Sequence, residues 1–121
     1  MKYMLLIHQG DAPTPRDPEA WATLSEDEQN AVYQDYMAIN QTPGVTPGEQ
    51  LEEPEMATTV RASGGETLTT DGPFADTKEF FGGYYLLEAD DIDAAIELAG
   101  RVPAARTGGA VEVRPIVERP S

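Results

Sequence analysis

The chain opens on residues 2–8, an almost unbroken apolar run that predicts a β-strand. Because consecutive positions are apolar, the run is typical of a central strand with other elements packed on both faces of its sheet. The proline-rich residues 10–18 that follow predict a loop. Residues 19–24 then predict a short helical turn around Trp21, the only tryptophan of the chain.

A longer helix is predicted from Ser25 onwards. In the segment Ser25-Glu-Asp-Glu28, the serine and the last glutamate have the spacing of a capping box, in which each side chain satisfies a free amide of the first turn. Pro43-Gly44 ends the helix, which therefore covers residues 25–41. The helical period gathers apolar side chains on one side of it: Val32, Tyr33, Tyr36, Met37 and Ile39.

The middle of the chain predicts short strands separated by turns. Prolines and glycines punctuate residues 43–55, which leave room only for a short edge strand near residues 49–52. Residues 57–62 and 67–70 are rich in β-branched side chains and flank Gly64-Gly65. They predict a β-hairpin, because the turns that join such strands need glycine at positive φ.

The last third of the chain predicts a strand, a helix and a final strand. Residues 82–89 are typical of a buried strand, and residues 110–117 alternate valine with charged side chains. Between them a helix begins at Asp90 or Asp91, where an acidic side chain suits the positive end of the helix dipole. The apolar stripe of this helix comprises Ile92, Ala95, Ile96, Ala99 and Val102.

The predicted order of elements, β-α-β-(β-β)-β-α-β, is that of an α+β ferredoxin-like sandwich. We expect a mostly antiparallel sheet with two helices on one face and an extra hairpin, in one domain over residues 1–121. The strands carry apolar residues on both faces, whereas the helices cover only one. The other face therefore predicts a homodimer of the dimeric α/β-barrel type, in which a second copy of the sheet supplies the cover.

The composition adds a strong acidic charge. The 121 residues include 8 basic and 22 acidic side chains, a formal net charge of −14, which argues against nucleic acid and membrane surfaces as partners. Residues 17–55 hold ten of the acidic side chains and no Lys or Arg. This stretch is either a solvated face or a docking surface for a basic protein such as a sigma factor. The lack of cysteine fits a cytoplasmic protein.

The segment Asp71-Gly-Pro-Phe-Ala-Asp-Thr-Lys-Glu79, together with residues 82–90, resembles the DGPF branch of the YCII-related bacterial proteins. Residues 1–7 and 102–115 are similar to the same family. The resemblance implies a ferredoxin-like fold, a homodimer with its sheets face to face, and a pocket between sheet and helices. In the wider superfamily it implies chemistry through a His–Asp pair, but residues 25–41 lack the histidine expected on the first helix.

His8 and Asp71 are the candidate catalytic residues. His8 is the only histidine, and an imidazole at the end of a strand can act as a general base near neutral pH or simply bond to backbone. Asp71 precedes Gly-Pro, so it either forms a turn by bonding its own backbone or stands at the lip of a pocket. Should a carboxylate lie within hydrogen-bond reach of His8, the pair would fit the acid–base chemistry of a lyase or isomerase.

Five further residues are candidates for contact with a ligand: Phe74, Lys78, Tyr33, Tyr84 and Arg106. Phe74 and Lys78 share the loop after Asp71, which the family resemblance implies to line the pocket. The tyrosines are core or interface aromatics unless a hydroxyl faces a cavity, where it would orient a ligand. Arg106 would favour a carboxylate-bearing ligand if it faced a pocket, and otherwise pairs with surface acids.

The sequence contains no motif for a metal or a cofactor, and we expect neither. One histidine without cysteine cannot build a zinc site, and the acidic residues lack the spacing of a calcium loop. Neither Gly64-Gly65 nor Gly82-Gly83 belongs to a phosphate-binding loop. Three functions remain open: a dimer that binds and transforms a small molecule, a regulatory module that meets a basic protein, and a ligand sensor without turnover.

Overall fold

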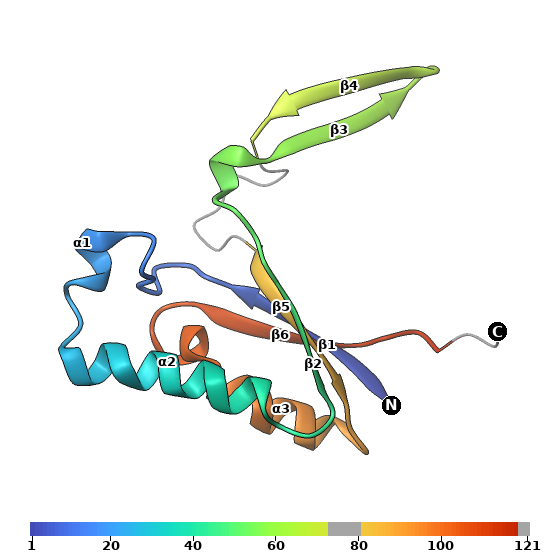
Figure 1. Cartoon of the computed structure of the whole chain (residues 1–121). Helices are drawn as coiled ribbons and strands as arrows, with labels where there is room; N and C mark the ends of the chain where they lie inside the picture. Colours follow the sequence, from blue (N-terminus) through green and yellow to red (C-terminus); the bar gives the residue numbers. More distant parts are fainter. Residues whose placement is uncertain (73–80, 119–121) are drawn as a thin grey trace.

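A computed structural model describes residues 1–72 and 81–118 of the chain (Figure 1). Its helices are α1 (Pro18–Trp21), α2 (Glu26–Asn40) and α3 (Ile92–Arg101), with 3₁₀ turns η1 (Pro54–Met56) and η2 (Pro103–Arg106). Its strands are β1 (Lys2–His8), β2 (Val45–Gln50), β3 (Thr58–Ser63), β4 (Glu66–Asp71), β5 (Phe81–Glu88) and β6 (Ala110–Pro115).

Four strands form one antiparallel sheet in the order β2-β5-β1-β6. Helices α2 and α3 cover the same face of this sheet, whereas β3 and β4 form a separate two-stranded sheet on the other side (Figure 1). The first strand in the chain therefore lies in the middle of the sheet, as its apolar run predicts. This arrangement confirms the α+β ferredoxin-like fold with an extra hairpin.

The hydrophobic core lies between the sheet and the helices. Alternate residues of β1 point into it, namely Tyr3, Leu5 and Ile7, and in β5 the opposite positions are Leu87, Tyr85 and Gly83. The helix layer completes the core with Ile39, Ala95, Leu98, Ala99, Val102 and Ala104. Burial of these apolar side chains is the main force that holds the two layers together.

Helix α2 begins as predicted but packs differently. The capping box forms: the amide of Glu28 donates to Ser25 Oγ at 3.1 Å, and the amide of Ser25 donates to Glu28 Oε1 at 2.9 Å. Of the predicted apolar stripe, Ile39 is buried, but Tyr33 and Met37 are 50% and 60% exposed. The predicted stripe is wider than the buried face, because only the C-terminal part of α2 reaches the core and the flanking positions turn to solvent.

The predicted stripe of α3 is also partly wrong. Asp91 caps the helix as one of the two predicted alternatives, with its Oδ1 accepting from the amide of Ala94 at 3.0 Å. Leu98 is buried together with Ala95 and Ala99, whereas Ile92 and Ile96 are exposed. Small side chains at the contact let a helix approach its neighbours closely, so the helix turns these two alanines rather than its isoleucines to the sheet.

The second strand lies earlier in the chain than predicted, at β2 rather than residues 49–52. Strand β2 is at the edge of the sheet, where Pro47 is tolerated because one side of the strand needs no donor. At Gly48 a Cβ atom would overlap the carbonyl oxygen and the ring of Tyr84. The edge position therefore agrees with the prediction, and only the bounds of the strand differ.

Strands β3 and β4 form the predicted hairpin, which we call the arm (residues 58–71). Its tip is Gly64-Gly65, with φ of 57° and 82°, the positive values that its turn requires. The base of the arm is closed by the Gly72 amide, which donates to the Ala57 carbonyl at 2.7 Å. The arm extends away from the body of the protein (Figure 1).

The capping box of α2 allows a test of this fold. We expect Ser25→Ala to lower the free energy of unfolding by about 1 kcal/mol, since the first turn loses the acceptor for one of its free amides. Urea unfolding followed by circular dichroism would measure this. The matched control is Gln34→Ala at an exposed position of the same helix. Equal stabilities for both variants would show that the capping box does not hold this helix end.

Candidate functional site

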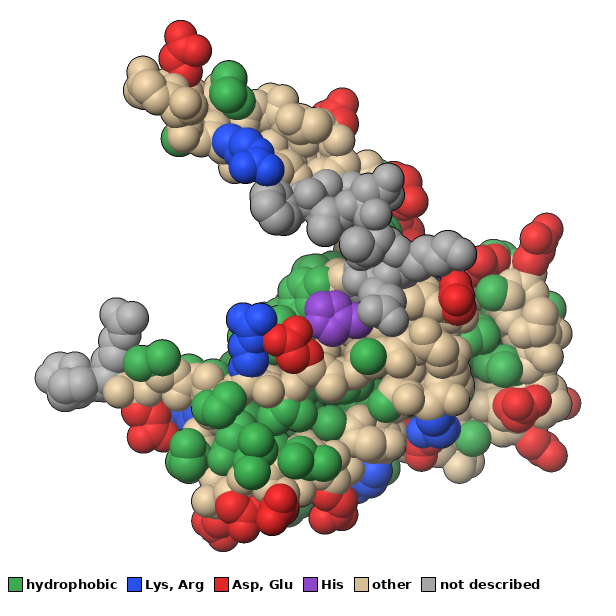
Figure 2. Space-filling view, turned by 180° about the vertical axis from the view of Figure 1, so that it is seen from behind, with side chains coloured by type: hydrophobic (Ala, Val, Ile, Leu, Met, Phe, Trp, Pro, Cys, Tyr) green, Lys and Arg blue, Asp and Glu red, His purple; other side chains and the backbone are tan. Residues whose placement is uncertain are grey.

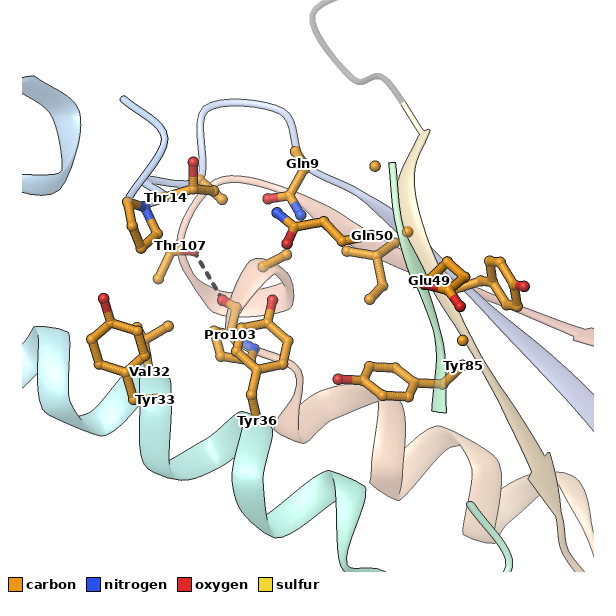
Figure 3. A pocket seen from close by; sticks show the side chains of 18 of the residues that line it. Gln9, Thr14, Val32, Tyr33, Tyr36, Glu49, Gln50, Tyr85, Pro103 and Thr107 are labelled. Carbon is orange, nitrogen blue, oxygen red and sulfur yellow. Dashed lines mark hydrogen bonds between the residues drawn. The ribbon is translucent and has the colours of Figure 1, made fainter. Parts of the chain in front are cut away.

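A cavity of about 360 Å³ lies between α2 and the sheet (Figure 3). Its walls come from α2, from the end of β1 and the loop after it, from β2 and β5, and from η2 and the residue that follows. The volume is at the lower end of the range for small-molecule sites. The lining includes Ile7, Gln9, Thr14, Val32, Tyr33, Tyr36, Asn40, Glu49, Gln50, Tyr85 and Thr107.

Tyrosine rings form one wall of this cavity. Figure 3 shows Tyr33 and Tyr36 rising from α2 and Tyr85 reaching across from the sheet, with the hydroxyls of Tyr36 and Tyr85 turned toward the enclosed space. Burial raises the pKa of Tyr36 to about 12, with a smaller contribution from Tyr85, and burial also raises the pKa of Tyr85. Both hydroxyls therefore stay protonated at neutral pH and can donate hydrogen bonds.

Amide side chains face the tyrosines from the other end of the cavity. Figure 3 shows Gln9, which follows β1, next to Gln50 from the end of β2. Gly82 makes room for this arrangement, because a Cβ atom there would lie 2.6 Å from Cγ of Gln9. Each amide offers both donors and acceptors. Among the described lining residues, Glu49 is the one side chain with a formal charge.

Of the predicted ligand-binding residues, Tyr33 and Tyr84 border the cavity. Tyr33 also stacks edge-on against Trp21, with 5.5 Å between ring centroids, and so connects α2 to α1. The ring of Tyr84 points to the face of the sheet opposite to that of Tyr85, because alternate residues of a strand point to opposite faces. Of these two residues, Tyr33 therefore lies on the cavity side of the sheet, and its contact with a ligand stays a prediction.

Arg106 does not face the cavity directly. Its guanidinium forms an ion pair with Asp35 of α2 and also donates to the Arg101 carbonyl at 3.5 Å. Its charge acts on Tyr36, whose pKa it lowers slightly against the larger effect of burial. The residue therefore joins η2 to α2 behind the tyrosine wall, which matches the surface-pairing alternative of the sequence analysis.

His8 points to the face of the sheet away from the helices, because Ile7 before it points into the core. Its Nε2 lies 3.1 Å from Oε1 of Glu112, whose Oε2 accepts from Arg114 Nε at 2.6 Å. The Arg114 hydrogen bond, and next that of His8, lower the pKa of the Glu112 carboxyl. In Figure 2 the histidine is at the surface beside basic and acidic side chains. A carboxylate is within reach of His8, but the pair and the cavity are on opposite faces.

Asp71 lies at the end of β4, opposite Thr58, in an exposed position of the arm. The strands of the arm pack on each other and make few contacts with other described elements. The carboxylate that the structure places beside His8 is therefore Glu112 rather than Asp71. Phe74 and Lys78 lie outside the described residues.

Several cavity residues were not foreseen from the sequence. The sequence predicts Tyr36 only as part of the apolar stripe of a helix, and it predicts no role for Gln9 and Thr14, which follow the first strand. The residue after a central strand often faces a cavity, but no pattern along the chain indicated that Gln9 would meet Gln50. Such a contact needs the sheet order, which places β2 and β1 on either side of β5.

Comparison with known proteins shows the family of this chain. The family model of the YCII-related domain matches residues 1–119. The chain belongs to the YCII-related family. It is also similar to an uncharacterised protein of Rhizobium meliloti (strain 1021), with 33% identity over 121 residues that cover 96% of this chain and 92% of that protein. These matches confirm the resemblance to the YCII-related family.

Two further properties hold for residues 1–72 and 81–118. No helix there is long and apolar enough to cross a membrane. No group of three or more histidine, aspartate and glutamate side chains in that part of the YCII-related chain is arranged to hold a metal ion.

The burial of Tyr36 allows a pH test. The raised pKa means that the folded state holds this proton more tightly than the unfolded state, so stability is present below about pH 10 and is lost as the pH rises toward 12. We expect Tyr36→Phe to flatten this fall in the free energy of unfolding. Urea unfolding at several alkaline pH values would measure it. A slope that is identical in wild type and variant would contradict the burial of the hydroxyl.

Proposed function

We propose that this YCII-related protein binds a small, uncharged molecule in the cavity between α2 and the sheet, and that it acts as a homodimer. The observation that carries the proposal is the convergence of neutral polar groups on one cavity that is partly open to solvent. The hydroxyls of Tyr36 and Tyr85 approach it from one side and the amides of Gln9 and Gln50 from the other. An apolar pocket with a few convergent polar groups is the usual form of a ligand site.

The chemistry of the lining defines the class of ligand. Tyrosine rings favour a flat, partly apolar molecule, and their protonated hydroxyls favour an acceptor such as a carbonyl oxygen. The cavity of about 360 Å³ limits the ligand to roughly the size of one substituted ring. Glu49 in the lining and the net charge of −14 disfavour an anion.

The loop after β1 closes one side of the cavity and is held in place at both ends. The Asp11 amide donates to the Gly108 carbonyl at 3.4 Å. Arg16 donates to the Leu51 carbonyl at 3.2 Å and lies 3.6 and 3.7 Å from the carboxylates of Glu52 and Glu53. The loop thus joins the end of β1 to the end of β2 along one side of the cavity.

The proposal is binding rather than acid–base turnover by His8. The His8–Glu112 pair is on the face of the sheet opposite to the tyrosines. A general base must lie within hydrogen-bond reach of the proton that it takes, directly or through one water. His8→Ala is therefore expected to leave binding in the cavity unchanged. This result is the one expected of a protein that binds a ligand without transforming it.

The homodimer is supported by the face of the sheet that the helices leave open. Met4 and Leu6 of β1 and Leu86 of β5 lie there, half-buried. Tyr84 and the exposed Phe81 extend this apolar area toward His8. An open face of this composition is typical of a surface that a second copy covers.

Filling the cavity tests the proposed binding. We expect wild-type protein to bind neutral single-ring compounds such as benzamide, phenol or 2-pyridone in ligand-observed NMR, and to bind benzoate about tenfold or more weakly than benzamide. Val32→Trp should abolish binding, because the indole would occupy the space beside Tyr36. The matched control is Met37→Trp, 60% exposed on the same helix. Equal binding by both variants, or a preference for benzoate, would contradict the proposal.

A further inference from the structure

A second cavity, of about 340 Å³, adjoins the first cavity, which lies between α2 and the sheet. Its walls come from the loop after β1, from α1, from the end of β2 with the residues that follow it, and from the start of β5. The first and the second cavity share five lining residues: Gln9, Ala12, Thr14, Gln50 and Gly82. The two cavities therefore meet along a common border, and one molecule of suitable shape can extend from one into the other.

The border between the two cavities consists mainly of small residues and two long amide side chains. Ala12 and Gly82 take little space there, whereas the side chains of Gln9 and Gln50 lie next to each other (Figure 3). No hydrogen bond within residues 1–72 and 81–118 engages either side-chain amide. Each amide is therefore available to donate to, and to accept from, a ligand that passes along the border.

The two cavities differ in the chemistry of their linings. Tyrosine rings form one wall of the first cavity, where Glu49 is the one described lining residue with a formal charge. Among the described residues that line the second cavity none is aromatic, and four are charged: Asp11, Arg16, Asp17 and Glu53. The first cavity therefore favours an aromatic group, and the second favours a polar group that forms hydrogen bonds.

The charges of the second cavity disfavour an anionic group. Arg16 is the one basic residue among its described lining residues, and its guanidinium already lies 3.6 and 3.7 Å from the carboxylates of Glu52 and Glu53. Asp11 and Asp17 add two further carboxylates. Carboxylates only accept hydrogen bonds and so favour N–H donors, whereas the amides of the border also supply donors for a carbonyl oxygen. An uncharged carboxamide offers both kinds of group.

Helix α1 connects the walls of the two cavities. Its residue Ala20 lines the second cavity, and the neighbouring Trp21 stacks edge-on against Tyr33, which lines the first. The side chain of Gln29 on α2 donates to the Trp21 carbonyl at 3.0 Å. These contacts join α1 to α2, so the same packing defines both cavities.

We propose that the ligand of this protein has two parts: a flat ring that occupies the first cavity, and a short uncharged tail with a carboxamide that lies in the second. The tail passes Gln9 and Gln50, whose side chains form hydrogen bonds with its polar groups. The inference rests on the proposed binding in the first cavity and adds the class of substituent that the ring carries. Gln9 and Gln50 are then the residues that select a substituted ring over a bare one.

Matched ligands test the tail in the wild-type protein. We expect N-benzoylglycinamide to bind about tenfold more tightly than benzamide in ligand-observed NMR titrations, because its tail adds hydrogen bonds in the second cavity. N-isobutylbenzamide has a tail of the same size without the carboxamide, and N-benzoylglycine has a carboxylate in its place. The first should gain less than about threefold over benzamide, and the second should bind about tenfold or more weakly than N-benzoylglycinamide.

The variant Ala20→Phe shows which cavity holds the tail, because Ala20 lines the second cavity and not the first. The added ring takes up that space, so the advantage of N-benzoylglycinamide over benzamide should fall below about twofold while benzamide binds as before. The matched control is Ala22→Phe, exposed at the C-terminal end of the same helix, which should keep the advantage. An advantage that Ala20→Phe leaves intact would place the tail elsewhere and contradict the proposal.

A second variant changes the charge of the second cavity instead of its volume, at Asp11, which is exposed. Asp11→Lys should bind N-benzoylglycine about tenfold more tightly than the wild type, because an ammonium group then faces the carboxylate of the tail. The matched control is Asp27→Lys on α2, which makes the same change in net charge away from both cavities and should alter this affinity less than about twofold. Equal effects of the two variants would show that the tail does not lie beside Asp11.

The outcomes separate this inference from the proposed function. If benzamide binds but N-benzoylglycinamide gains nothing over it, binding in the first cavity stands and the two-part ligand fails. If N-isobutylbenzamide gains as much as N-benzoylglycinamide, polar groups do not recognise the tail, which overturns the assignment of the second cavity. If neither benzamide nor N-benzoylglycinamide binds, both the proposed function and this inference are overturned.

Discussion

The structure depends on one constraint: its central strand is apolar on both faces, and the helices can cover only one. Leu5 and its alternate neighbours on β1 point to α2 and α3, while Leu6 and its neighbours point the other way. The helix layer buries the first set and forms the core with it. The second set is only half-buried within the single chain, and the proposed dimer would cover it.

The cavity is a consequence of how α2 meets that core. Ile39 near the end of the helix is buried, whereas Tyr36 and Val32, about one and two turns earlier, border a space instead of packing tightly on the sheet. The loop after β1 and the edge strand β2 enclose this space, with Arg16 joining them. Because α2 does not pack tightly on the sheet here, α2, the loop after β1 and β2 surround a cavity that the buried hydroxyls of Tyr36 and Tyr85 face.

The family relationship and the geometry emphasise different residues. The sequence directed attention to His8 and Asp71, one a rare residue type and the other part of a recognisable motif. The structure separates the His8–Glu112 pair from the cavity by the thickness of the sheet and places Asp71 on the arm. Composition and motif single out residues by their rarity, whereas a binding site is assembled from common residues such as Gln9, Gln50 and Tyr36 by the packing around them.

The sequence by itself determined the local features of this protein. The capping box at Ser25, the cap at Asp91 and the Gly64-Gly65 turn follow from short-range rules, because each depends on residues that are near in the chain. Only the tertiary structure decided which side of α3 is buried, why Pro47 and Gly48 fit a strand, and where Gln9 meets Gln50. Those outcomes depend on contacts between segments far apart in sequence, which periodicity cannot encode because it describes one element at a time.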